Sequence, residues 1–260
     1  MCGRYTLHHS TQEVAERFGV QQVLFPTTAR YNIAPSQPVA VVTQGSMATP
    51  NNKDEVRWLE AMKWGLVPFW AKDPDIGNRL INARAETVAE KPAFRNAIKR
   101  RRCIIPGDGF YEWKRDGKVR IPMRIHRRDN GVFGFAGLWE EWESPDGSPL
   151  RTCTIITTEP NEIMAVIHDR MPAILRPEDE ERWLDTSVGS VPDVLPMLKP
   201  YPADELAAHP VSRRVNAPAF DDPGCIEPVE IEQVEAESVR QEQPAKANER
   251  QYTLRIQNSE

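Results

Sequence analysis

The chain has 260 residues, of which 40% are hydrophobic and 27% charged, so it can bury one large core and is not disordered throughout. No apolar run approaches the ~20 residues that cross a bilayer, and no signal-peptide core follows Met1. We therefore expect a cytosolic protein, working as a monomer, that has no contact with membranes. The four cysteines are widely spaced, which argues against a disulfide framework: Cys2, Cys103, Cys153 and Cys225.

The net charge of −5 is unevenly distributed along the chain. Residues 227–260 carry eight acidic and four basic side chains, which leaves residues 1–226 at −1. This end is also poor in large apolar residues, so we expect a folded body over 1–226 and a flexible acidic tail over 227–260, with a short ordered piece at Tyr252–Ile256. In the body, Lys91–Arg102 holds six cations and no acid. That stripe suits either the solvated end of a helix or an anion-binding surface.

Secondary-structure signals are short and irregularly ordered. Ser10 and Glu13 form a capping box and Gly19 is a helix stop, which predicts a helix between them. Further helices are predicted at Pro92–Lys99, at Thr158–Ile167 and from Pro177 through Trp183 and Leu184. Five runs of β-branched and aromatic residues predict strands: Val39–Thr43, Val56–Met62, Val119–Ile125, Val132–Leu138 and Thr152–Thr157. This mixture predicts an α+β fold, a single compact domain with a mixed, barrel-like β-sheet flanked by short helices.

The first candidate for chemistry is Cys2. Cytosolic methionine aminopeptidase removes Met1 when the second residue is small, which would leave an α-amine (pKa ~7.7–8.0) beside a thiol (pKa ~8.5). Such a 1,2-aminothiol condenses with an aldehyde to an imine, and the thiol then closes a thiazolidine ring. The alternative is a small residue tolerated near a frayed terminus.

Polar candidates lie further along. Asn82 and Arg84 follow an apolar pair, as at the end of a strand. Glu112 is flanked by aromatic residues, so burial would raise its pKa and suit it to general acid catalysis, whereas on an alternating strand it would face solvent. His168 closes an apolar helix, where it acts either as a catalyst or as a helix-terminal cation.

The remaining candidates for function are Trp70 and two consecutive histidines, His8 and His9. Trp64 suits the core, whereas Trp70, after a proline and a phenylalanine, could stand exposed and stack on a nucleic-acid base. The histidine pair and the cysteines make no zinc spacing, so we expect no metal and no cofactor.

Taken together, these segments resemble the SOS response-associated peptidase (SRAP) family, the abasic-site-processing proteins. The ordered set across residues 2–220 carries the resemblance, and it consists of Met1-Cys2-Gly3-Arg4-Tyr5, Arg30-Tyr31-Asn32-Ile33-Ala34-Pro35, Trp64-Gly65, Ile81-Asn82-Ala83-Arg84-Ala85-Glu86-Thr87, Pro106-Gly107-Asp108-Gly109-Phe110-Tyr111-Glu112-Trp113-Lys114, Ile167-His168-Asp169-Arg170-Met171-Pro172 and His209-Pro210-Val211-Ser212.

The resemblance implies a covalent cross-link to the aldehyde of an abasic site in single-stranded DNA, which shields the lesion from strand cleavage. By position, Cys2 would be the nucleophile, Asn82 would hold its amine and the sugar, Glu112 would exchange protons, and His168 would act at the sugar oxygen and in reversal. The residues implied as DNA contacts are Arg84 and Arg170 on phosphates, with Arg4, Asn32, Thr157 and the stacking Trp70.

Two other functions stay open at this stage. A cysteine hydrolase would use Cys2 with His168 and Glu112, and autocatalytic removal of Met1 would be its minimal form. It would need an oxyanion hole and a peptide groove, for which the sequence has no signal. The third possibility is a non-catalytic single-strand DNA binder in which Cys2 is incidental.

Overall fold

The computed structural model describes the chain except for residues 1, 47–54, 118, 187–189 and 235–260. At its centre five strands form a closed barrel, in the order β11 (Pro149–Thr158), β10 (Phe133–Glu143), β7 (Arg102–Gly107), β4 (Pro38–Ser46) and β5 (Glu55–Trp64). The ring closes because β5 also pairs with β11, in parallel, whereas the other barrel pairs are antiparallel. The predicted α+β fold with a mixed, barrel-like sheet is therefore confirmed.

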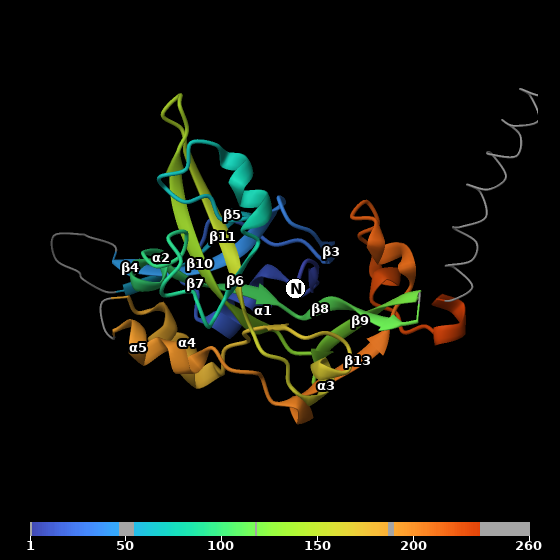
Figure 1. The fold of residues 1–260 in the computed structure, drawn as a ribbon. Coiled ribbons are helices and arrows are strands. Elements are labelled where there is room, and N and C mark those ends of the chain that lie inside the picture. The colour runs from blue at the N-terminus through green and yellow to red at the C-terminus, as the bar shows by residue number, and fades with distance from the viewer. Residues whose placement is uncertain (1, 47–54, 118, 187–189, 235–260) are drawn as a thin grey trace, which may run out of the picture.

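A second, five-stranded sheet lies beside the barrel. Its strands pair in the order β13 (Leu206–Pro210), β9 (Val119–Arg127), β8 (Gly109–Asp116), β1 (Tyr5–Leu7) and β3 (Arg30–Ile33). The chain passes from β7 of the barrel to β8 of this sheet through a single residue, Asp108. Figure 1 shows β8, β9 and β13 to one side of the long β10–β11 hairpin.

Three short strands extend the barrel sheet. β6 (Asn82–Arg84) pairs in parallel with β11, β12 (Met171–Pro172) pairs antiparallel with the end of β11, and β2 (Gln22–Val23) pairs with β5. β6 places Asn82 opposite Ile155 of β11, and from there its side chain reaches the carbonyl of Cys2, just before β1 of the second sheet.

Helices are short and peripheral. They comprise α1 (Thr11–Phe18), α2 (Ala97–Arg100), α3 (Glu162–Ala165), α4 (Pro177–Leu184) and α5 (Val191–Val194), with 3₁₀ turns at Pro74–Arg79, Leu195–Met197, Ala203–Glu205, Arg213–Asn216 and Pro223–Cys225. None of the helices in the described part of the chain is long and apolar enough to cross a membrane.

The α1 and α4 predictions are confirmed, with the capping box at Ser10, a left-handed Gly19 and Pro177 in the first turn of α4. The other two helices are shorter than predicted. Only the last three residues of the first candidate, 97–99, belong to α2, which follows a series of turns and runs one residue further to Arg100. In the second, Thr158 still belongs to β11, where it pairs with Met171, and Asn161 caps α3 by accepting the Met164 N–H at 2.9 Å.

The main core fills the barrel and its junction with the second sheet. Tyr5, Trp64 and Phe135 are buried, and the Tyr5 ring lies edge-on to the other two rings at 5.4 and 5.6 Å. The prediction that Trp64 packs in the core is confirmed. A smaller cluster of Tyr111, Val211, Val215 and Cys225 holds the C-terminal turns against β8.

The body extends slightly past the predicted boundary at residue 226. Pro228 forms a β-bridge with Val211, and the N–H of Val229 donates to the carbonyl of Pro210 at 3.0 Å. The predicted ordered piece at Tyr252–Ile256 lies outside the described residues, and the acidic tail stays a prediction.

Candidate active site

Cys2 is fully buried between the barrel sheet and the second sheet. From β6, Asn82 Nδ2 donates to the carbonyl oxygen of Cys2 at 2.9 Å, and from β8 the N–H of Tyr111 donates to the carbonyl of Arg4 at 3.0 Å. The Cys2 thiol also points to that Arg4 carbonyl, with 3.8 Å between sulfur and oxygen. The start of the chain is thus held in place, and the frayed-terminus alternative does not describe this structure.

The two polar atoms of the Asn82 side-chain amide differ in their hydrogen bonding. Its Nδ2 binds Cys2, whereas its Oδ1 is buried and has no hydrogen-bond partner among the described residues. Asn82 opens β6, opposite Ile155 of β11, so the expectation that it follows the end of a strand is wrong. A buried amide oxygen without a partner costs about 1–3 kcal/mol, which points to a group that it accepts from in the working protein.

Glu112 and His168 lie together beside Cys2. The Glu112 carboxyl is 3% exposed on β8, and His168 Nε2 lies 3.9 Å from its Oε2. Burial raises the pKa of Glu112 above its usual value. Glu112 is therefore inward-facing, and the solvent-facing alternative is wrong.

The backbone around His168 orients its ring. The N–H of Arg170 donates to His168 Nδ1 at 3.1 Å, so a neutral ring carries its proton on Nε2, the nitrogen that faces Glu112. The exposed Asp169 carboxylate lies 2.9 Å from Nδ1 and would pair with a protonated ring. His168 follows α3 and does not close a long helix.

Burial and Glu112 both raise the pKa of the Cys2 thiol, burial more strongly. The thiol is therefore mainly protonated at neutral pH, and a thiolate is not the resting form of this site.

Arg84, Thr157 and Arg170 converge at one edge of the site. Arg84 is exposed and lies opposite Thr157 in the β6–β11 register. Arg170 binds both carboxylate oxygens of Glu86, at 2.6 and 3.0 Å, and donates to the Thr157 carbonyl at 2.7 Å. Thr157 itself is buried, with its hydroxyl 3.4 Å from Arg170 Nη2. In this ion pair the Glu86 side chain is 52% exposed, whereas that of Arg170 is 14% exposed.

Arg4 and Asn32 make internal contacts. Arg4 donates to Asn32 Oδ1 at 3.0 Å and to the carbonyls of Val215 and Asn216. Asn32 is fully buried, and its Nδ2 faces three backbone carbonyls of the C-terminal turns. In this structure Asn32 thus clamps the segment that carries Arg4, and its contact with DNA stays a prediction. Sequence reasoning missed this clamp, because its partners are carbonyls more than 180 residues away.

Trp70 lies on the surface. Its side chain is 48% exposed and that of Phe69 54%, which agrees with the prediction of a tryptophan available for stacking. Lys99, Arg100 and Arg101 of the basic stripe line a hollow together with Phe69. Arg102 does not belong to that surface, since it is buried and donates to three backbone carbonyls.

The comparisons with known proteins match this geometry to one family. The model of the SOS response associated peptidase (SRAP) family matches residues 1–218. The chain is 48% identical over 235 residues to the abasic site processing protein YoqW of Bacillus subtilis, covering 87% of this chain and 99% of the relative. It is 32% identical over 225 residues to the abasic site processing protein HMCES of Gallus gallus, covering 77% of this chain and 66% of the relative.

A solved structure from Bacteroides thetaiotaomicron has the same fold. Its TM-score is 0.75 at 28% identity, with 88% of this chain and all of that chain covered.

Proposed function

Because the chain belongs to the SOS response-associated peptidase family, whose relatives from Bacillus subtilis and Gallus gallus are named abasic site processing proteins, we propose that it captures abasic sites in single-stranded DNA. The product is a thiazolidine cross-link through Cys2, formed after removal of Met1. The observation that carries this proposal is the placement of Cys2, held by Asn82 and facing the Glu112–His168 pair.

The chemistry begins at the amine and ends at the thiol. The α-amine of Cys2 adds to the C1′ aldehyde, and loss of one water gives an imine. The thiol sulfur then adds to the imine carbon while its proton passes to the nitrogen, so aldehyde and aminothiol yield thiazolidine and water. The raised pKa of the buried thiol supports this order, because a free α-amine with a pKa of ~7.7–8.0 is the better nucleophile at neutral pH.

Glu112 supplies and accepts the protons of these steps. Opening the closed sugar to its aldehyde, and expelling water from the carbinolamine, both need a proton donor and acceptor close to the reacting carbon. Burial raises the pKa of the Glu112 carboxyl toward neutral pH, which suits it to proton exchange in both directions. His168 would act on the sugar oxygen through Nε2 and assist reversal, and the buried Oδ1 of Asn82 would accept from the amine or the sugar.

Arg84 and Arg170 are proposed to bind the phosphates beside the lesion, with Thr157 at their junction and Trp70 stacking on the strand. Phosphate contacts bind irrespective of sequence, which allows a chain of net charge −5 to hold DNA through a local basic surface. Arg4, which is only partly buried, is also proposed as a DNA contact, and Asn32 supports it by accepting a hydrogen bond from its guanidinium.

A denaturing gel with an abasic single-stranded oligonucleotide tests the proposal. The wild type is expected to give a heat-stable shifted band, whereas Cys2→Ser gives only an imine that must be trapped by reduction. An N-terminal extension that blocks Met1 removal should abolish the stable band with the thiol intact. Cys225→Ser, at another buried cysteine, is the matched control and should cross-link normally.

The same experiment separates the alternatives. A stable adduct on a chain that retains Met1 would contradict the aminothiol mechanism. A band that never appears, with release of a peptide product, would favour the cysteine hydrolase. DNA binding without any covalent band would favour the non-catalytic binder.

A further inference from the structure

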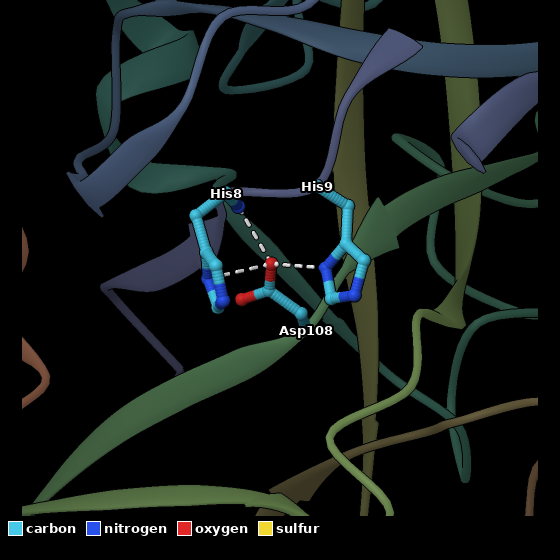
Figure 2. A group of neighbouring side chains, drawn as sticks. All are labelled: His8, His9 and Asp108. Carbon is cyan, nitrogen blue, oxygen red and sulfur yellow. Dashed lines mark hydrogen bonds and ion pairs between the residues drawn. The ribbon is translucent and has the colours of Figure 1, made fainter. Parts of the chain in front are cut away.

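A second cluster of reactive side chains lies where β1 and the β7–β8 connection meet. Asp108 Oδ2 lies 2.9 Å from His8 Nδ1 and 3.0 Å from His9 Nδ1, and Figure 2 shows the two rings on either side of the carboxylate. All three donor atoms lie within 4.8 Å of one another. We propose that His8, His9 and Asp108 bind one divalent transition-metal ion of the Zn²⁺ class.

The donor types favour such an ion. Two imidazole nitrogens and one carboxylate oxygen suit Zn²⁺, Co²⁺ or Ni²⁺, whereas Mg²⁺ and Ca²⁺ prefer all-oxygen sites. Metal bonds of about 2.1 Å place neighbouring ligands about 3.0–3.4 Å apart at angles between about 90° and 109°. The two observed nitrogen–oxygen distances are at the short end of this range, so small ring movements admit the ion.

Contacts on Oδ1, the other carboxylate oxygen of Asp108, orient this carboxylate. Thr6 Oγ1 donates to Asp108 Oδ1 at 2.5 Å, and Arg124 Nη2 lies 3.6 Å from that same oxygen. Oδ2 is thereby turned toward the histidines, where it also accepts the backbone N–H of His8 at 2.6 Å. Such outer contacts orient ligands and strengthen metal sites.

The His8 ring packs against a neighbouring ring, and both histidine side chains are partly exposed to solvent. The Tyr31 ring stacks on His8 with centroids 5.5 Å apart and planes 14° from parallel. The side chains of His8 and His9 are 28% and 20% exposed, whereas that of Asp108 is fully buried. An ion bound there would keep its remaining positions for water, because solvent reaches the histidine side only.

A proton is the natural competitor of the metal. Burial alone would raise the pKa of Asp108, but hydrogen bonds from His8, His9 and Thr6 outweigh it and hold that pKa well below its usual range. The hydrogen bond to Asp108 raises the pKa of His9. Imidazole binds a metal only through an unprotonated nitrogen, so metal binding should weaken as the pH falls.

Calorimetric titration of the EDTA-treated full chain with Zn²⁺, and with Mg²⁺ as the negative probe, tests the site. One Zn²⁺ per chain and no Mg²⁺ response are expected, with release of protons that grows toward lower pH. His8→Gln and His9→Gln should each weaken Zn²⁺ binding by about 10-fold or more. The titration is repeated in Cys2→Ser, because the N-terminal aminothiol can itself chelate zinc.

His126→Gln is the matched control. His126 and His209 also lie with ring centroids 5.2 Å apart, but they belong to no three-ligand group among the described residues. Zn²⁺ should raise the melting temperature of the wild type and of His126→Gln, and not that of His9→Gln. Circular dichroism of each metal-free variant shows that it is folded. Equal Zn²⁺ affinity in all three histidine variants, loss of binding in Cys2→Ser alone, or no saturable binding would each overturn the proposal.

Discussion

Asp108 and Glu112 are two carboxyl groups four residues apart, both buried, at opposite ends of the contact between β1 and β8. Their pKa values shift in opposite directions. Hydrogen bonds from three neighbours outweigh burial at Asp108 and keep it ionised, whereas at Glu112 burial dominates and favours the protonated form. Burial alone therefore does not decide the state of a carboxyl group; the number of donors aimed at it does. Asp108 holds β1 in place, and Glu112 is left able to exchange a proton.

The largest expected effect is on stability, at Asp108. Asp108→Asn would leave the buried Arg124 without its counter-charge and weaken the bonds to Thr6 and His8. We expect a loss of about 3–5 kcal/mol in the free energy of unfolding, the usual cost of removing one partner of a buried pair. Urea denaturation measures it. A loss below about 1 kcal/mol would mean that Asp108 does not hold this junction.

Glu112→Gln should show the converse, little effect on stability and a large effect on rate. An amide keeps the shape of the side chain but cannot exchange a proton, so cross-linking to abasic DNA should slow by about 100-fold or more. Single-turnover gel kinetics measure the rate, and urea denaturation at neutral pH should show a stability equal to or above that of the wild type. A variant that cross-links at the wild-type rate would remove Glu112 from the mechanism.

The pH dependence of stability should differ in sign between the two carboxyl groups. Asp108 has a lowered pKa in the folded chain, so its contribution is present above its unfolded pKa of ~3.9 and is lost as the pH falls further. Glu112 has a raised pKa, so the folded chain loses stability as the pH rises from ~4.3 to the folded pKa, at about 1.4 kcal/mol for each pH unit between those two values. Unfolding free energies of Glu112→Gln and the wild type, measured from about pH 4 to about pH 8, should therefore diverge with rising pH, in favour of the variant. Parallel curves would contradict the assignment.

The smallest expected effect is on DNA affinity, at Arg170, and Arg124 is the arginine with which it is compared. Arg124 is committed to buried Asp108, whereas Arg170 pairs with the half-exposed Glu86, which we expect a DNA phosphate to replace. Arg170→Gln should weaken single-strand binding and lower the slope of log affinity against log salt by about 1, with little change in stability. Glu86→Gln is the matched control and should bind DNA more tightly, since it removes the competing anion. If both variants lose stability and keep the wild-type salt slope, Arg170 is a structural residue.

Local patterns predicted much of the fold. The five strand predictions fall within β4, β5, β9, β10 and β11 or overlap them, because runs of β-branched residues reflect burial on a pleated surface. The closure of the barrel through β5 and β11 depends on a contact between residues 63 and 152, which no local pattern encodes. The strands β1, β3 and β13 are three to five residues long, too short for a periodic signal.

In the candidate site, too, the sequence indicated individual residues but not the contacts between distant segments. The resemblance to a family named Cys2, Asn82, Glu112 and His168, and the structure brings Cys2 within one hydrogen bond of Asn82 and Glu112 beside His168. Their catalytic roles stay predictions. What sequence reasoning missed are contacts between distant segments, such as Asp108 with His9, 99 residues apart. The sequence also places Arg102 in a surface stripe, because charge patterns do not reveal that backbone carbonyls can satisfy a buried guanidinium.

The clamp of Arg4 on the carbonyls of Val215 and Asn216 has a consequence for synthesis on the ribosome. This clamp cannot form until residue 216 has left the exit tunnel, because its carbonyls are among the last parts of the body to be made. At about 5–20 residues per second, the growing chain stays open at its start for roughly 10–40 s. If a separate aminopeptidase removes Met1, we expect it to act within that interval, because the folded chain buries Cys2 completely. Under the proposed function, the order of translation would then set a time window for making the aminothiol.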